Sequence, residues 1–140
     1  MNVGDIMSTE LVTCSPNDTI YQIAKKLQQE DIGSCPVVDQ NRLIGIVTDR
    51  DITVRAVSKD LDVHNTRVSD IMTTNLVVGS PSMSLEEACM LMADHQVRRL
   101  PIVENDKLVG IIAQADLAID LEEEELLAET IEKISKPSHF

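Results

Sequence analysis

The stretch that decides the fold is CPVVDQNRLIGIVTDRDI at residues 35–52, because the chain repeats it as LPIVENDKLVGIIAQADL at residues 100–117. In both stretches two apolar runs flank a polar tetrad, residues 39–42 and 104–107, whose composition is typical of a tight turn. Each stretch therefore predicts a β-hairpin. The two hairpins are expected to have the same shape.

The repetition extends well beyond the hairpins. A shift of 65 positions aligns residues 3–52 with residues 68–117 without a gap, and VGDIMSTELV then lies over VSDIMTTNLV. A match of this length indicates an internal duplication, in which each copy is one structural unit. We therefore predict a single module, residues 1–140, with copies at 3–60 and 66–122 and an acidic helical tail at 123–140.

Each copy predicts the order strand, helix, strand, strand, helix. The first strand covers residues 11–13 or 76–78, and a Ser-Pro turn follows it. Capping boxes at Thr19-x-x-Gln22 and Ser84-x-x-Glu87 mark the start of the first helix. The helix stripes expected to be buried are Ile20, Ile23, Ala24, Leu27 and Leu85, Ala88, Cys89, Met92. The fold class is mixed α/β, with two copies that share a core about a pseudo-two-fold axis.

Composition excludes several classes of function. The chain has 140 residues with one Tyr, one Phe and no Trp, so it lacks aromatic platforms for stacking bases. Its formal net charge of -12 repels nucleic acids and anionic membrane surfaces. No apolar run approaches the ~20 residues that span a bilayer, and the N-terminus does not resemble a signal peptide. We expect a cytoplasmic protein.

The cysteines and histidines do not suggest a metal site. Cys14, Cys35 and Cys89 are an odd number at wide spacings, and the repeat aligns them with Gly79, Leu100 and Ala24, so packing roles are favoured over thiol chemistry. The histidines have no ligand residues at metal-binding spacing; they are His64, His95 and His139. We expect neither a metal nor a cofactor.

The two units resemble a tandem pair of CBS domains, a Bateman module. The likeness covers residues 1 to about 122, and GIVTDRDI at 45–52 matches that family's motif of Gly, an apolar residue, then Thr or Ser and Asp. The resemblance implies binding of adenosine-containing ligands such as AMP, ADP, ATP or S-adenosylmethionine. It also implies homodimers that pair through helices.

One stretch has the chemistry for such a ligand. Thr48 and Asp51 bracket a predicted helix start, where free amides and the helix dipole favour an anion and the Asp51 carboxylate suits ribose hydroxyls. The same spacing also satisfies a capping box, which needs no ligand. The resemblance implies a composite main cleft formed by Thr48, Arg50, Asp51, Ser80, Leu85, Val97, Arg98 and Arg99.

A second cleft departs from the family pattern. By the same resemblance it joins Ser15, Ile20, Ile32, Gly33, Ser34 and Asp116. Ala113 stands there where a hydroxyl is expected, and Gly33-Ser34 replaces the pair Arg98-Arg99, which binds phosphate bidentately. We expect this cleft to hold a phosphate more weakly.

The interpretation favoured overall is a stand-alone regulatory module that binds an adenine nucleotide and signals to an unidentified partner protein. The alternatives are a ligand-free scaffold with vestigial clefts and an enzyme such as a nucleotide hydrolase, which would need a nucleophile and base that the main cleft lacks. The first helix of the second copy carries Met90 and Leu91 where the first copy has Lys25 and Lys26, so it is apolar on nearly every side, which favours a homodimer. The tail could be a solvated face, pack on the module, lengthen the dimer interface or dock a partner.

Overall fold

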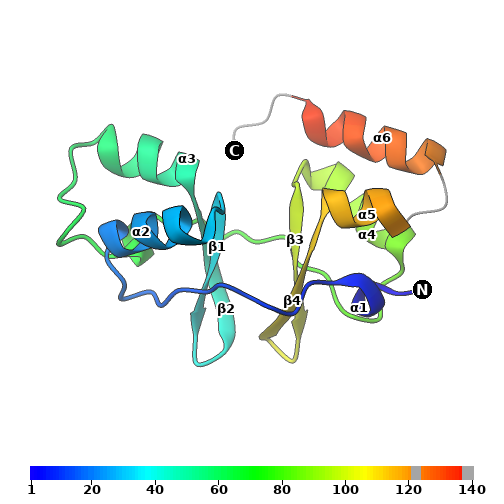
Figure 1. The fold of residues 1–140 in the computed structure, drawn as a ribbon, viewed down its shortest axis with the longest axis horizontal. Helices are drawn as coiled ribbons and strands as arrows, with labels where there is room; N and C mark the ends of the chain where they lie inside the picture. Colours follow the sequence, from blue (N-terminus) through cyan, green and yellow to red (C-terminus); the bar gives the residue numbers. More distant parts are fainter. Residues whose placement is uncertain (121–123, 137–140) are drawn as a thin grey trace. The chain divides into compact units, whose positions relative to one another are not determined.

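The structure, a computed structural model, describes residues 1–120 and 124–136 (Figure 1). The chain divides into two compact units. The β1–β2 unit is Val12–Leu76, and the β3–β4 unit combines Met1–Leu11 with Val77–Phe140. The expected mixed α/β class is confirmed, because each unit combines an antiparallel hairpin with helices.

The two units contain corresponding elements. The β1–β2 unit has α2 (Ile20–Glu30), β1 (Ser34–Asp39), β2 (Arg42–Thr48), α3 (Asp49–Asp51), the π-helix η1 (Ile52–Val57) and the 3-10 helix η2 (Val68–Asp70). The β3–β4 unit has α1 (Val3–Ile6), α4 (Leu85–His95), β3 (Arg99–Glu104), β4 (Lys107–Ala113), α5 (Gln114–Asp120) and α6 (Glu124–Ser135).

The hairpins form where the sequence predicts them. The strands β1 and β2 pair from Ser34↔Thr48 to Asp39↔Arg42, and the two linking residues have positive φ, which the primed turns of two-residue hairpins require. The second hairpin repeats this geometry, with its linking residues at Asn105 and Asp106. The first strand predicted in each copy, residues 11–13 or 76–78, does not form; the structure has an isolated parallel bridge one residue later, Cys14↔Val37 or Gly79↔Ile102.

The first helix of each copy begins at the predicted cap. The hydroxyl of Thr19 accepts the N–H of Gln22 at 3.2 Å, and the Gln22 side chain accepts the N–H of Thr19 at 2.8 Å. Ser84 caps α4 in the same way by accepting the N–H of Glu87 at 3.1 Å. The predicted apolar stripes are buried at Ile20, Ile23 and Leu27 in α2 and at Leu85, Ala88, Cys89 and Met92 in α4. The remaining predicted position, Ala24, is only partly buried.

The N-terminal segment of each copy packs on the other copy. The N–H of Val3 donates to Met83 O at 2.8 Å and that of Gly4 to Pro81 O at 2.9 Å, so α1 joins the β3–β4 unit (Figure 1). Residues 68–76, which the alignment pairs with residues 3–11, lie instead in the β1–β2 unit. The sequence repeat and the compact unit are therefore offset by one segment.

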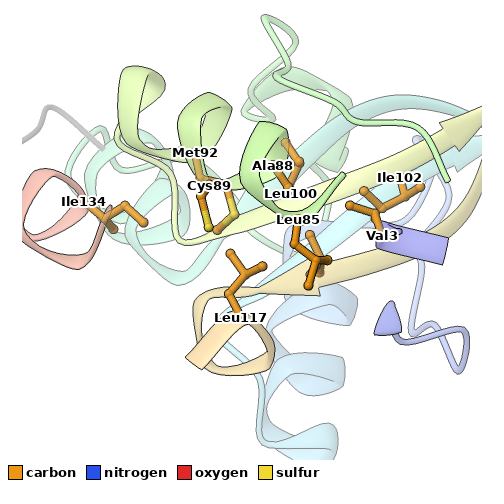
Figure 2. Packing of buried hydrophobic residues seen from close by; sticks show 10 residues of the cluster. Val3, Leu85, Ala88, Cys89, Met92, Leu100, Ile102, Leu117 and Ile134 are labelled. Atoms are coloured by element: carbon orange, nitrogen blue, oxygen red, sulfur yellow. The ribbon is translucent and has the colours of Figure 1, made fainter. Parts of the chain in front are cut away.

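Each unit has its own cluster of buried hydrophobic residues. We expected one core shared by the two copies, whereas the buried residues form two clusters. The cluster of the β3–β4 unit gathers side chains from α1, α4, the hairpin, α5 and α6 (Figure 2): Val3, Leu85, Ala88, Cys89, Met92, Leu100, Ile102, Ile112, Leu117 and Ile134. We call residues 3–11 and 68–76 the exchanged segments, because each packs on the other copy. The first of them contributes a core residue to the β3–β4 unit, since Val3 is fully buried there.

The C-terminal helix covers part of the apolar helix α4. Ile134 of α6 belongs to the same cluster as Cys89 and Met92 of α4, and the Gln96 side chain donates to Lys133 O at 3.4 Å. Some of the apolar surface that favoured a dimer is thus covered within the chain. The side chains of the acidic run at 122–125 lie outside the described part of the structure. In the described part of the chain no helix is long and apolar enough to cross a membrane.

Candidate functional site

The residues Thr48 and Asp51 form a closed hydrogen-bond ring at the start of α3. The N–H of Thr48 donates to Asp51 Oδ2 at 2.9 Å, and the N–H of Asp51 donates to Thr48 Oγ1 at 3.0 Å. This is the capping box that the spacing allowed. The ring fixes the Asp51 side chain, which is only 7% exposed.

A basic side chain pairs with the same carboxylate. The Nε atom of Arg55 lies 3.6 Å from Asp51 Oδ1, and its Nη1 donates to Ile71 O at 3.2 Å. An ionised carboxylate has about four lone-pair sites. The capping bond and this ion pair leave acceptor capacity on Asp51 for a ligand. Sequence reasoning missed Arg55, although its spacing of four residues from Asp51 on a helix was the signal.

The entrance of strand β1 lies next to this helix start. Ser34 pairs with Thr48 across the hairpin, and the N–H of Asp49 donates to Gly33 O at 2.9 Å. A Cβ atom added to Gly33 would lie 3.2 Å from Asp49 Oδ2, so a side chain there would crowd that carboxylate. The β1–β2 unit therefore brings residues of both predicted clefts together, Thr48 and Asp51 from one, Gly33 and Ser34 from the other.

The β3–β4 unit has the same arrangement with different residues. Arg99 pairs with Ala113 across the hairpin, and the N–H of Gln114 donates to Arg98 O at 3.0 Å. Asp116 Oδ2 accepts the N–H of Ala113 at 2.7 Å, but Ala113 has no hydroxyl to complete the ring. Both arginines are exposed and Asp116 is half-buried.

The other predicted site residues divide between core and surface. Ile20 and Leu85 occupy the first helical position after each cap, and both are buried in the hydrophobic clusters of their units. Ser15 Oγ accepts the N–H of Asn17 at 3.3 Å, and Ser80 Oγ lies 3.4 Å from Ser82 Oγ. Of the remaining predicted site residues, Ile32 and Val97 are partly exposed and Arg50 is exposed.

Each predicted cleft combines residues of both units, so its assembly stays a prediction. Within each unit, the structure places the first residues of one strand, β1 or β3, beside the N-terminus of a helix, α3 or α5. In the β1–β2 unit this arrangement presents a helix start, the buried carboxylate of Asp51 and the exposed Arg50. Such a surface can bind a polyol beside an anion. Among residues 1–120 and 124–136, no cluster of three potential metal ligands occurs. His139 lies outside these ranges.

Comparison with known proteins identifies the class. The sequence profile of the CBS domain matches residues 3–57 and again 68–123. The chain belongs to the CBS domain family, as a tandem pair, and the resemblance inferred from the sequence is confirmed.

A relative and two solved structures illustrate the likeness. The CBS domain-containing protein YhcV of Bacillus subtilis is 46% identical over 134 residues, which are 96% of this chain and 95% of YhcV. The structure of CBSX2 in complex with AMP has a TM-score of 0.74 at 29% identity, covering 84% of this chain and 93% of CBSX2. The CBS domain pair of MJ0100, in complex with 5′-methylthioadenosine and S-adenosyl-L-methionine, has a TM-score of 0.73 at 26% identity, covering 85% and 94%.

Proposed function

We propose that this protein is a regulatory module that binds an adenosine-containing ligand and passes the bound state to a partner protein. The observation that carries the proposal is the buried Asp51 carboxylate, held by Thr48 and Arg55 with acceptor capacity to spare. The complexes of CBSX2 with AMP and of the MJ0100 pair with S-adenosyl-L-methionine support this class of ligand.

In this proposal Asp51 accepts the ribose hydroxyls, and the phosphate binds at the start of α3. The ring that Asp51 forms with Thr48 keeps the carboxylate in one orientation, so little side-chain entropy is lost when the ribose binds. The proposed main site completes this half with Ser80, Leu85, Val97, Arg98 and Arg99 from the other copy. Guanidinium groups favour phosphate over neutral ligands, since they donate bidentately to it.

The second proposed site has Asp116 as its ribose acceptor, with Ser15, Ile20, Ile32, Gly33 and Ser34. It has no hydroxyl at position 113 and no arginine at positions 33 and 34, so its affinity for a phosphate is expected to be lower. We propose one nucleotide site of high affinity for each chain. An uncharged nucleoside is the ligand that suits the second site.

No enzymatic step enters the proposal. Thr48 and Asp51 accept each other's backbone amides, and Arg55 forms an ion pair with Asp51, whereas a hydrolase would need a base there to activate water. The module is proposed to act as a cytoplasmic homodimer whose geometry changes on binding, and the change is read by a separate protein.

Calorimetry with AMP, ADP, ATP and S-adenosylmethionine tests the proposal. The informative variant is Asp51→Asn, because the amide oxygen can still accept the N–H of Thr48 while the negative charge is lost. We expect a roughly 10- to 100-fold weaker Kd, since bonds to a charged acceptor contribute about 1.5 to 3 kcal/mol. The matched control is Asp116→Asn, which should leave the tighter site unchanged.

Three outcomes would contradict the proposal in different ways. Absence of binding and of any thermal shift with all four ligands would favour a scaffold, because a ligand at ~100 times Kd should stabilise the fold by roughly 2.7 kcal/mol. Two equivalent tight sites would contradict the asymmetry. Sustained nucleotide turnover that Asp51→Asn abolishes would indicate an enzyme.

A further inference from the structure

Two cysteines that are distant in the sequence meet inside the β1–β2 unit. The Sγ atom of Cys14 lies 3.5 Å from Pro36 O, and the Sγ atom of Cys35 lies 3.7 Å from the same oxygen. The Sγ atom of Cys35 also lies 3.4 Å from Val12 O. Both are buried, with exposed fractions of 4% for Cys14 and 0% for Cys35. Both are free thiols, and their sulfur atoms approach the same carbonyl oxygen.

The other unit shows that the fold brings these two positions together and that packing does not require sulfur there. The positions that correspond to Cys14 and Cys35 are Gly79 and Leu100. A Cβ atom added to Gly79 would lie 2.9 Å from Leu100 Cδ2, so these two positions also face each other. A glycine and a leucine fill the space in one unit, whereas two thiols fill it in the other.

A positive charge lies beside the thiols. Lys26 Nζ donates to Thr13 O at 2.7 Å, and the corresponding residue of the other copy is Leu91, which is uncharged. The neighbouring Cys14 thiol, and further the charge of Lys26, lower the pKa of Cys35 against the opposing effects of burial and of the Asp18 carboxylate. The neighbouring Cys35 thiol, followed by burial, raises the pKa of Cys14. Of the two thiols, Cys35 is therefore the one that ionises more readily.

We propose that Cys14 and Cys35 are a redox-active dithiol pair that hydrogen peroxide oxidises to an intrachain disulfide. The Cys35 thiolate attacks the peroxide oxygen and becomes a sulfenic acid, while the O–O bond breaks and the leaving oxygen departs as water after taking up a proton. The sulfur of Cys14 then attacks the sulfenic sulfur, and a second water leaves. Two thiols lose two electrons and two protons, and one hydrogen peroxide becomes two waters.

Access to the buried pair requires only a local opening. The segment that carries Cys14 is held to β1 by two backbone hydrogen bonds, Cys14 N to Pro36 O at 3.0 Å and Val38 N to Cys14 O at 2.9 Å. Short segments of this kind open far more often than the whole fold unfolds. Transient intracellular disulfides are usually redox-sensing, which is the role that we assign to this pair. The proposal does not depend on nucleotide binding.

Peptide mapping of the native protein after treatment with hydrogen peroxide tests the proposal. Cleavage after Lys and Arg separates Cys14, in residues 1–25, from Cys35, in residues 27–42. We expect these two peptides to be linked, and dithiothreitol to release them. The melting temperature should rise by roughly 5 to 10 °C, because the crosslink restricts the unfolded chain. Cys89, which is buried in α4 and recovered in residues 68–98, is the internal control and should stay reduced.

Two variants separate a redox role from packing. The double variant Cys14→Gly/Cys35→Leu introduces the residues of the other copy, so it should fold and show no linked peptide and no peroxide-dependent change in melting temperature. The variant Lys26→Leu should form the same disulfide several-fold more slowly. Three results would overturn the proposal: no linked peptide in the folded wild type, linkage only in denaturant, or oxidation of Cys89 as fast as that of the pair.

Discussion

Thr48 and Asp51 each accept the backbone N–H of the other, at 3.0 Å and 2.9 Å. The corresponding pair of the other copy, Ala113 and Asp116, has only half of this ring, in which Asp116 accepts the N–H of Ala113 at 2.7 Å. The duplication therefore provides a comparison of complete and incomplete caps in one protein. The complete ring at Asp51, the proposed ribose acceptor, depends on one hydroxyl group, that of Thr48.

The first prediction concerns this hydroxyl. Thr48→Ala should lower the free energy of unfolding by about 1 kcal/mol, since it removes the acceptor for the N–H of Asp51. The reciprocal variant Ala113→Thr should stabilise the protein by up to about 1 kcal/mol, because it completes the ring at α5. Urea unfolding measures both. Equal and small effects in the two variants would mean that the hydroxyl contributes nothing to either cap.

The second prediction concerns the exchanged segments. Val3 and Val68 correspond in the repeat and both are fully buried, but Val3 packs in the β3–β4 unit and Val68 in the β1–β2 unit. Truncating either to Ala should cost about 2 kcal/mol. Hydrogen exchange should show the loss of protection in different places: β3 and β4 for Val3→Ala, β1 and β2 for Val68→Ala. If Val3→Ala instead weakened protection in β1 and β2, and Val68→Ala in β3 and β4, each segment would pack on its own copy.

The repeat explains both what the sequence predicted and what it could not. Hairpins and helix caps depend on neighbouring residues, so the polar tetrads and Thr19-x-x-Gln22 were sufficient to predict them. The exchange of segments was missed because the copies carry the same residues at the docking positions, Val3 and Val68 among them. An N-terminal segment that packs on its own copy would bury the same side chains as one that packs on the other copy. Nothing in the residue pattern distinguishes these two arrangements.

The candidate site was predicted in part for a related reason. The capping spacing of Thr48 and Asp51 is local, and the structure contains it. The ion pair of Asp51 with Arg55 was overlooked because Asp120 stands at the corresponding position of the other copy, so the repeat drew no attention to it. The meeting of Cys14 and Cys35 depends on strand pairing across the unit, which spacing along the chain does not reveal.

The third prediction concerns two glycines, Gly45 in β2 and Gly110 in β4. A Cβ atom on Gly110 would overlap the side chain of Met7, and one on Gly45 would overlap that of Met72. Gly110→Ala and Gly45→Ala should each lower the free energy of unfolding by about 1 to 3 kcal/mol, because the methyl group forces the methionine out of place.

A double-mutant cycle identifies the cause of this loss. Shortening the methionine in Gly110→Ala/Met7→Ala should cost less than the sum of the two single changes, as expected for residues in contact. Gly33→Ala is a milder comparison, because its nearest atom, Asp49 Oδ2, lies 3.2 Å away on a side chain. Additive effects at Gly110 and Met7 would contradict the predicted contact.

The last prediction separates the two apolar faces of α4. Ile134 of α6 is 3% exposed and belongs to the cluster that contains Cys89 and Met92, whereas Met90 on α4 is 58% exposed. Ile134→Ala should lower the free energy of unfolding by about 2 kcal/mol or more. The change should leave the proposed homodimer intact, because α6 covers a face that the dimer does not need. Glu132→Gln, at an exposed position of the same helix, should change stability by less than about 0.5 kcal/mol.

Met90→Glu should have the opposite effect. A charge at an exposed position costs the monomer little, but it would be desolvated in a dimer interface, so sedimentation velocity should show a monomer with a nearly unchanged melting temperature. If Met90→Glu leaves the dimer intact while Ile134→Ala dissociates it into monomers, α6 forms the interface instead. A wild-type chain that sediments as a monomer at micromolar concentration would remove the homodimer from the proposal, and α6 would then be sufficient to explain why α4 is so apolar.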